Sequence, residues 1–198
     1  MTLRKWFYLF WTTLVIGALG ALITGLVLQA NDQEFSWLGG SALGFNIVNM
    51  LLGGATISVL SQMGFFAYLI IRFIAMGIVR SKWVWDTLQL LLVIVSIVDL
   101  VVLRHTEQSS GWTTYLALPL LMLILAVSVA LLKVKLTNRN GFIPTLFFMT
   151  AVTAIEAVPA LRLDSAASTL FMMVPLLACN AWQILILSKV LKTNKEPL

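Results

Sequence analysis

Two acidic residues in apolar surroundings are the first places in this sequence where chemistry could occur. Asp99 and Glu156 each lie near the end of a long hydrophobic run, and each is followed within two turns by a basic residue, Arg104 or Arg162. A carboxylate inside a membrane is costly, so by default such a residue indicates a functional site. The sequence therefore predicts a polar cluster or ligand site formed by these four residues.

Two interpretations of this cluster remain open. In the first, the four residues form interfacial ion pairs and interhelical hydrogen bonds, and the latter average about 0.6 kcal/mol each. In the second, Asp99 and Glu156 line an acidic, outward-facing pocket between the third and fifth predicted spans, which binds a small cation or another ligand. Transporters usually place such sites at the midplane beside broken helices. Four prolines could kink helices, but none flanks an acid at that depth.

Enzymatic chemistry has little support in the sequence. The single histidine, His105, has no HExxH spacing that would provide a second zinc ligand. The single cysteine, Cys179, has no positioned base beside it of the kind that activates a nucleophile. No glycine-rich phosphate-binding or dinucleotide-binding motif occurs. We therefore expect no catalytic residue, no cofactor, no metal and no enzymatic activity.

The composition defines the elements that must position these residues. Of the 198 residues, 60% are hydrophobic and 11% are charged, whereas soluble domains carry about 25% charged residues. The apolar residues form blocks of about 20, the length that crosses a bilayer as a helix, and they lack the period of two of barrel strands. The sequence therefore predicts an all-α, polytopic integral membrane protein, a bundle of six transmembrane helices in a single domain 1–198 without a soluble domain. The predicted spans are about 6–28, 45–69, 83–103, 113–132, 142–161 and 168–187.

The first span could be read as a signal peptide, because Arg4 and Lys5 precede it and small residues lie within it. Its apolar sequence continues to Leu28, which is long for a signal peptide. We therefore predict a retained helix.

The basic residues predict the orientation. If the uncharged run Gly39–Ile71 crosses once, 11 of the 13 Lys and Arg residues fall on one side of the membrane. If it crosses twice, the division becomes nine against four. Basic loops stay in the cytoplasm, so one crossing and two cytoplasmic termini are favoured. This distribution also accounts for the basic pI without a nucleic-acid partner.

The run Gly39–Ile71 is longer than one span requires. One possibility is a span that ends near residue 69, followed by a segment, Ile70–Val84, that lies partly along the cytoplasmic interface. The other is a single long, tilted helix with a basic end. The sequence does not choose between them.

A ridge of small residues lies on the first predicted helix. Gly17, Ala21 and Gly25 recur every four residues, a spacing that lets another backbone approach closely. The partner could be a helix of the same bundle or of another protein, and packing within the bundle is favoured.

Several strings of residues resemble one family. The string Ser61–Leu69 followed by Arg72 and Phe73 is the longest of them. The similarity continues through Asp99–Val101 with Arg104, Thr137–Asn138, Phe142–Pro144, Leu146–Met149, Thr153, Ile155–Glu156, Pro159–Arg162, Pro175–Leu177 and Cys179–Ala181. In these strings the chain resembles the KinB-signalling-pathway activation proteins of endospore-forming bacteria.

This resemblance implies a non-enzymatic membrane protein of the bacterial cell membrane. It would activate a multi-span sensor histidine kinase of the KinB type and so act on the phosphorelay of sporulation. The resemblance supplies no catalytic or ligand residues. Its partners would be the kinase and membrane lipid, contacted through the spans and a candidate interface region that contains Gln62, Tyr68, Arg72 and Arg80. The alternative for Gln62 is a hydrogen bond between helices of the bundle, and the alternative function is a small-solute or ion transporter or sensor.

Overall fold

The computed structural model describes residues 3–31, 43–79, 81–107, 112–162 and 165–192. Apart from short connections, these ranges are helical, and they contain no strand. The long helices are α1 (Leu3–Asn31), α2 (Leu43–Ile78), α3 (Lys82–Glu107), α4 (Trp112–Leu136) and α7 (Ala166–Lys192). Between α4 and α7 lie the 3₁₀ turn η3 (Arg139–Gly141), α5 (Phe142–Phe147), the π-helical turn η4 (Phe148–Val152) and α6 (Thr153–Leu161).

Six helical segments of the described chain are long and apolar enough to cross a membrane. The fifth of them runs from Arg139 to Leu161, because η3, α5, η4 and α6 follow one another without a break. The predicted all-α class with six such helices is confirmed. Many large apolar side chains face outward, as expected where the surrounding solvent is lipid; Phe73, for example, is 82% exposed.

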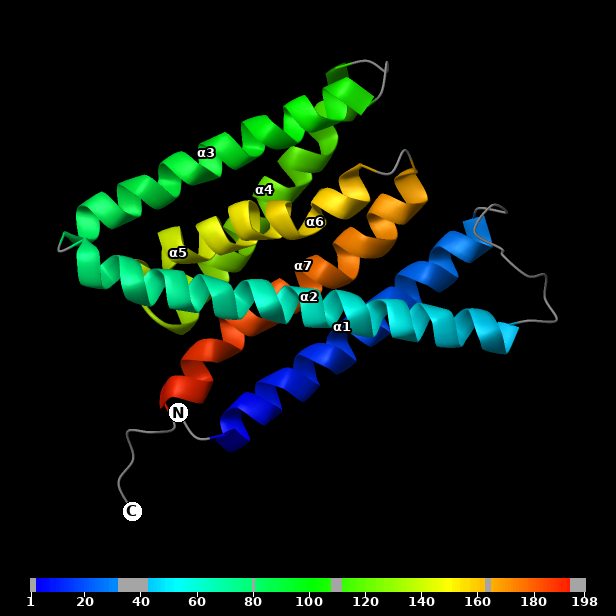
Figure 1. The fold of residues 1–198 in the computed structure, drawn as a ribbon, viewed down its shortest axis with the longest axis horizontal. Coiled ribbons are helices and arrows are strands. Elements are labelled where there is room, and N and C mark those ends of the chain that lie inside the picture. Colours follow the sequence, from blue (N-terminus) through cyan, green and yellow to red (C-terminus); the bar gives the residue numbers. More distant parts are fainter. Residues whose placement is uncertain (1–2, 32–42, 80, 108–111, 163–164, 193–198) are drawn as a thin grey trace.

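The six segments run back and forth, so that both ends of the described chain lie at the same end of the bundle (Figure 1). The junction between α2 and α3 and the connection from α4 to α5 lie at that end too. Here the Nζ of Lys5 donates a hydrogen bond to the carbonyl oxygen of Val190 at 3.0 Å, which ties the start of α1 to the end of α7. The described helix ends that carry these basic residues therefore lie together at one end of the bundle.

Helix α2 resolves the question of the uncharged run. It has 36 residues and continues unbroken to Ile78, and α3 begins at Lys82. At 1.5 Å per residue its length is about 54 Å, well beyond a hydrocarbon core of about 30 Å. Figure 1 shows α2 running obliquely across α1 and α7. Of the two possibilities, the structure has the single long helix, and residues 70–78 form no separate element.

The larger of the two apolar core clusters of the described residues draws side chains from α1, α2, α3, α4, α5, η4 and α7. Phe65 and Tyr68 of α2 pack on Phe148 of η4, with ring centroids 5.5 and 5.4 Å apart. Phe65 and Phe148 are fully buried. These aromatic contacts give the long helix a fixed position against the fifth segment, since aromatic pairs in such geometries add to the energy of burial.

The small-residue ridge of α1 faces α2 inside the bundle. Ala21 is fully buried, and a Cβ added to Gly25 would meet the side chain of Met50. A Cβ added to Gly54 of α2 would lie 2.6 Å from the Cβ of Ala21 and 2.8 Å from the Cα of Ala18. The backbones of α1 and α2 are therefore in near contact, and small residues on both helices permit it.

We expect Gly54→Ala to destabilise the bundle, because its new methyl group meets backbone atoms that cannot turn aside. Overpacking of this kind costs about 1–3 kcal/mol. Gly44→Ala is the matched control on the same helix, since a Cβ there meets nothing within 4 Å. Thermal unfolding in detergent should show a lower midpoint for Gly54→Ala alone; equal midpoints would contradict this packing.

Candidate functional site

A cluster of buried polar side chains joins α2, α6 and α7. We call it the polar cluster, and its members are Ser61, Thr153, Glu156, Asn180 and Gln183. Glu156 is 6% exposed and the other four are completely buried. Because each member lies away from water and lipid, its polar atoms must find partners within the cluster or remain unsatisfied.

Hydrogen bonds link the side chains of the polar cluster in series, from Gln183 through Ser61 and Asn180 to Thr153 and Glu156. The Nε2 of Gln183 donates to the Oγ of Ser61 at 2.6 Å, and that hydroxyl donates to the Oδ1 of Asn180 at 2.6 Å. The Nδ2 of Asn180 donates at 2.8 Å both to the Oγ1 of Thr153 and to the Oε2 of Glu156. Asn180 therefore connects all three helices through one side chain.

Two oxygen atoms at the ends of this chain have no hydrogen-bond partner, the Oε1 of Gln183 and the Oε1 of Glu156. The Glu156 oxygen lies against the backbone of α2, where a Cβ added to Gly64 would overlap it and would come within 2.7 Å of the Cδ. A glycine at position 64 is therefore what allows the carboxylate to enter the space between α2 and α6.

The π-helical turn η4 lies just before the residues that α6 contributes. The Oγ1 of Thr153 donates to the carbonyl oxygen of Phe148 at 3.2 Å, across the wide turn. A π turn inserts an extra residue, rotates the helix that follows and recurs at functional sites. The sequence predicts an ordinary helix over 142–161, so it did not reveal this feature, which sets the direction in which Glu156 points.

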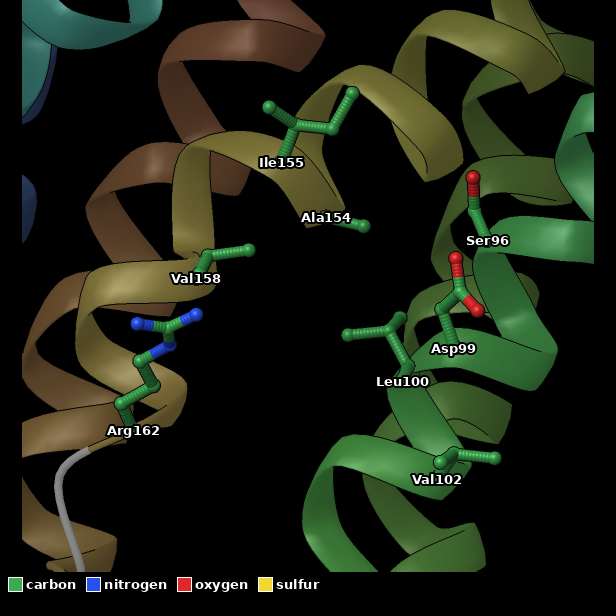
Figure 2. A pocket seen from close by; sticks show the side chains of 8 residues that line it. All are labelled: Ser96, Asp99, Leu100, Val102, Ala154, Ile155, Val158 and Arg162. Carbon is green, nitrogen blue, oxygen red and sulfur yellow. The ribbon is translucent and has the colours of Figure 1, made fainter.

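A groove between α3 and α6 holds two of the predicted site residues. Its volume is about 370 Å³, and its lining residues are Ser96, Asp99, Leu100, Val102, Ala154, Ile155, Val158 and Arg162. Figure 2 shows Asp99 on the α3 wall and Arg162 on the α6 wall, across a space otherwise bordered mainly by apolar side chains. The groove thus presents opposite charges on its two sides.

The structure separates the four residues of the predicted cluster. Asp99 and Arg162 share the groove between α3 and α6, whereas Glu156 belongs to the polar cluster and lines no part of that groove. Ile155, its neighbour in the chain, lines the groove in its place. Arg104 lies in α3, but its side chain is outside the described part of the structure.

The residues of the predicted interface region also differ in position. Gln62 is 4% exposed and its Nε2 donates to the carbonyl oxygen of Phe10 at 3.3 Å. Tyr68 is 2% exposed and its hydroxyl donates to the carbonyl oxygen of Pro144 at 3.4 Å. Both side chains therefore hold helices of the bundle together. Arg72 is half-buried, and Arg80 lies outside the described residues.

The polar cluster offers no nucleophile of the usual kind. Its two hydroxyls donate to an amide oxygen (Ser61) and to the carbonyl oxygen of Phe148 (Thr153), and each accepts from an amide nitrogen, so no base is placed to remove either proton. In the described residues, no three His, Cys, Asp or Glu side chains are grouped so as to hold a metal ion. The hydrogen bonds of the polar cluster hold α2, α6 and α7 in fixed orientations.

The fold and this site define a class: an all-helical protein with six segments of transmembrane length and an internal polar cluster. The family model described as KinB-signalling pathway activation in sporulation matches residues 17–190. The KinB-signaling pathway activation protein of Bacillus subtilis (strain 168) is 35% identical over 185 residues, which cover 91% of this chain and 93% of that protein. The chain belongs to this family. No solved structure matches it.

The contact between Gly64 and Glu156 can be tested by a double-mutant cycle. Gly64→Ala alone should lower the free energy of unfolding by about 1–3 kcal/mol, since the methyl group overlaps the carboxylate. In the Glu156→Ala background the same change should cost almost nothing, because the space is then free. Gly77→Ala is the control, as a Cβ there meets nothing within 4 Å.

Unfolding in detergent, followed by circular dichroism, measures all these variants. If Gly64→Ala costs as much with alanine at position 156 as with glutamate, the two residues do not meet as described.

Proposed function

We propose that this protein activates a sporulation sensor kinase of the KinB type, without catalysis of its own, through contacts between transmembrane helices. The observation that carries this proposal is membership of the family over residues 17–190, with a relative whose printed name assigns it to the activation of KinB signalling. The described chain consists almost entirely of six apolar helices. Such a chain has its contact surface within the membrane rather than on a soluble domain.

The mechanism we propose is a shift of the kinase's conformational equilibrium. A partner that binds two signalling states shifts their populations only by the difference between its affinities for them. The bundle is suited to this role because Asn180 and the close contact of α1 with α2 hold its helices in one arrangement. A rigid helical surface can favour one arrangement of the kinase's own helices.

The surface that best fits such a contact is the corner between α2 and α3. On both sides of Arg72, apolar side chains of α2 face outward, and Trp83, which is 77% exposed, follows at the start of α3. The exposed residues of this corner are Ile70, Ile71, Phe73, Ile74, Met76, Ile78 and Trp83. Because Gln62 and Tyr68 are buried, we assign the contact to this corner and to Arg72 beside it.

Complementation and crosslinking test this function together. We expect the chain to restore sporulation in a Bacillus subtilis strain that lacks its own KinB-signaling pathway activation protein. A cysteine at Phe73 should crosslink to the kinase in native membranes, whereas a cysteine at Ile124 should not. Ile124 is the matched control, since it is 62% exposed and belongs to α4, which is not part of the corner.

Restoration without any kinase crosslink from the corner would contradict the assigned surface. Failure of both assays, in cells that contain the intact protein, would contradict the function.

A second candidate function, transport or sensing of a small solute, is favoured by the groove between α3 and α6. Asp99 and Arg162 could bind a cation or a zwitterionic solute between the apolar walls. A flux into proteoliposomes that saturates and is abolished by Asp99→Asn would favour this function over activation by contact. We expect no such flux.

We further propose that the chain lies in the bacterial cell membrane with both termini in the cytoplasm. The support is that the described helix ends rich in Lys and Arg lie together at one end of the bundle, and positively charged segments stay in the cytoplasm. Tags at both termini should be protected from a membrane-impermeant reagent in intact cells, and a tag inserted at 108–111 should react. A reactive terminus would contradict this orientation.

A further inference from the structure

A basic groove lies between the start of α1 and the end of α7. Its volume is about 410 Å³, and it is lined by Arg4, Lys5, Tyr8, Ile186, Lys189 and Val190. Of the described residues that line the groove, three are cationic and none is acidic, and the two aliphatic ones are buried. A group that enters this groove therefore meets positive charge at its rim and apolar side chains at its base.

A second groove lies next to the basic groove. Its volume is about 390 Å³, and it is lined by Tyr8, Trp11, Thr12, Val15, Ile16 and Trp182. Tyr8 lines both grooves, so the two lie next to each other along α1. The Nε1 of Trp182 donates to the Oγ1 of Thr12 at 3.1 Å, which satisfies this indole and leaves a surface that is mainly aromatic and aliphatic.

The length of the combined groove corresponds to half a bilayer. From Lys5 to Ile16 helix α1 rises about 16 Å, at 1.5 Å per residue. Half of a hydrocarbon core is about 15 Å. The groove thus begins with cations at one end of the bundle and extends along α1 for about the depth that one acyl chain occupies.

We propose that this α1–α7 groove binds one anionic phospholipid. The phosphate is held by Arg4, Lys5 and Lys189, and an acyl chain lies along Trp11, Val15 and Ile16. Basic pockets between helices at the cytoplasmic boundary suit such headgroups. A zwitterionic lipid fits less well, because the described residues that line the groove include no acidic side chain to receive its ammonium group. The inference does not depend on the proposed kinase contact, which involves α2 and α3.

The proposal is tested on the full chain, purified in a neutral detergent and titrated with phosphatidylglycerol or phosphatidylcholine, with bound lipid counted by native mass spectrometry. We expect one phosphatidylglycerol to bind at least tenfold more tightly than phosphatidylcholine. The pair Arg4→Gln and Lys189→Gln should weaken it more than tenfold, since each basic side chain contributes about fivefold. Lys5 stays unchanged, as it also bonds Val190.

Two control measurements distinguish this site from general attraction. Lys135→Gln with Arg139→Gln removes the same charge from exposed positions that do not line the groove, and should leave binding unchanged. Val15→Trp should fill the acyl groove and weaken binding at least fivefold, whereas Ile124→Trp, at an exposed position of α4, should not.

Competition identifies the source of the phosphate. Inorganic phosphate and glycerol 3-phosphate should not displace phosphatidylglycerol, because neither fills the acyl groove. The proposal would be overturned if the two lipids bound equally well or if free phosphate displaced phosphatidylglycerol. It would also be overturned if the Lys135 and Arg139 substitutions weakened lipid binding as much as the Arg4 and Lys189 substitutions. Native mass spectra of every variant without lipid establish that the chain remains folded.

Discussion

The structure depends on the need to satisfy polar groups where no water is available. Asn180 meets this need for three helices at once, because its amide accepts from α2 and donates twice to α6. An unsatisfied polar group in such surroundings is expensive, so the helices that surround Asn180 are restricted to arrangements that keep these bonds. Apolar packing alone distinguishes poorly between rotations of a helix in lipid, and directed hydrogen bonds supply what it lacks.

Close backbone contact is the condition under which those bonds can form. Gly64 lets the carboxylate of Glu156 lie against α2, and Gly54 lets α2 approach Ala18 and Ala21 of α1. The π turn η4 rotates α6 so that Glu156 enters the interior while Ile155 faces the groove with Asp99. Small side chains and one irregular turn thus decide which polar residue is internal and which is available to a ligand.

The two ends of the bundle carry different surface features. The end that carries the termini combines cations with grooves and an exposed apolar corner, features suited to lipid headgroups and to a partner's helices. Toward the opposite end lies the groove with Asp99 and Arg162. The kinase contact and the lipid site that we propose thus lie at one end of the bundle, and the groove with Asp99 and Arg162 lies toward the other.

The sequence by itself determined the class of fold, the number of long apolar helices and the family, because block length, hydrophobicity and strings of matching residues are local properties of the chain. It also singled out Asp99, Glu156 and Arg162, since a charged residue in an apolar run is visible without a structure. It left open whether α2 is one helix or a helix with an interfacial segment, because both fit the same uncharged run. Only the tertiary structure decided that Glu156 joins Asn180 rather than Asp99, and that Gln62 and Tyr68 are internal. The physical reason is that the rotation of each helix about its axis determines which of its faces meets a neighbouring helix. Here the π turn η4 and the close contacts made at Gly54 and Gly64 set that rotation.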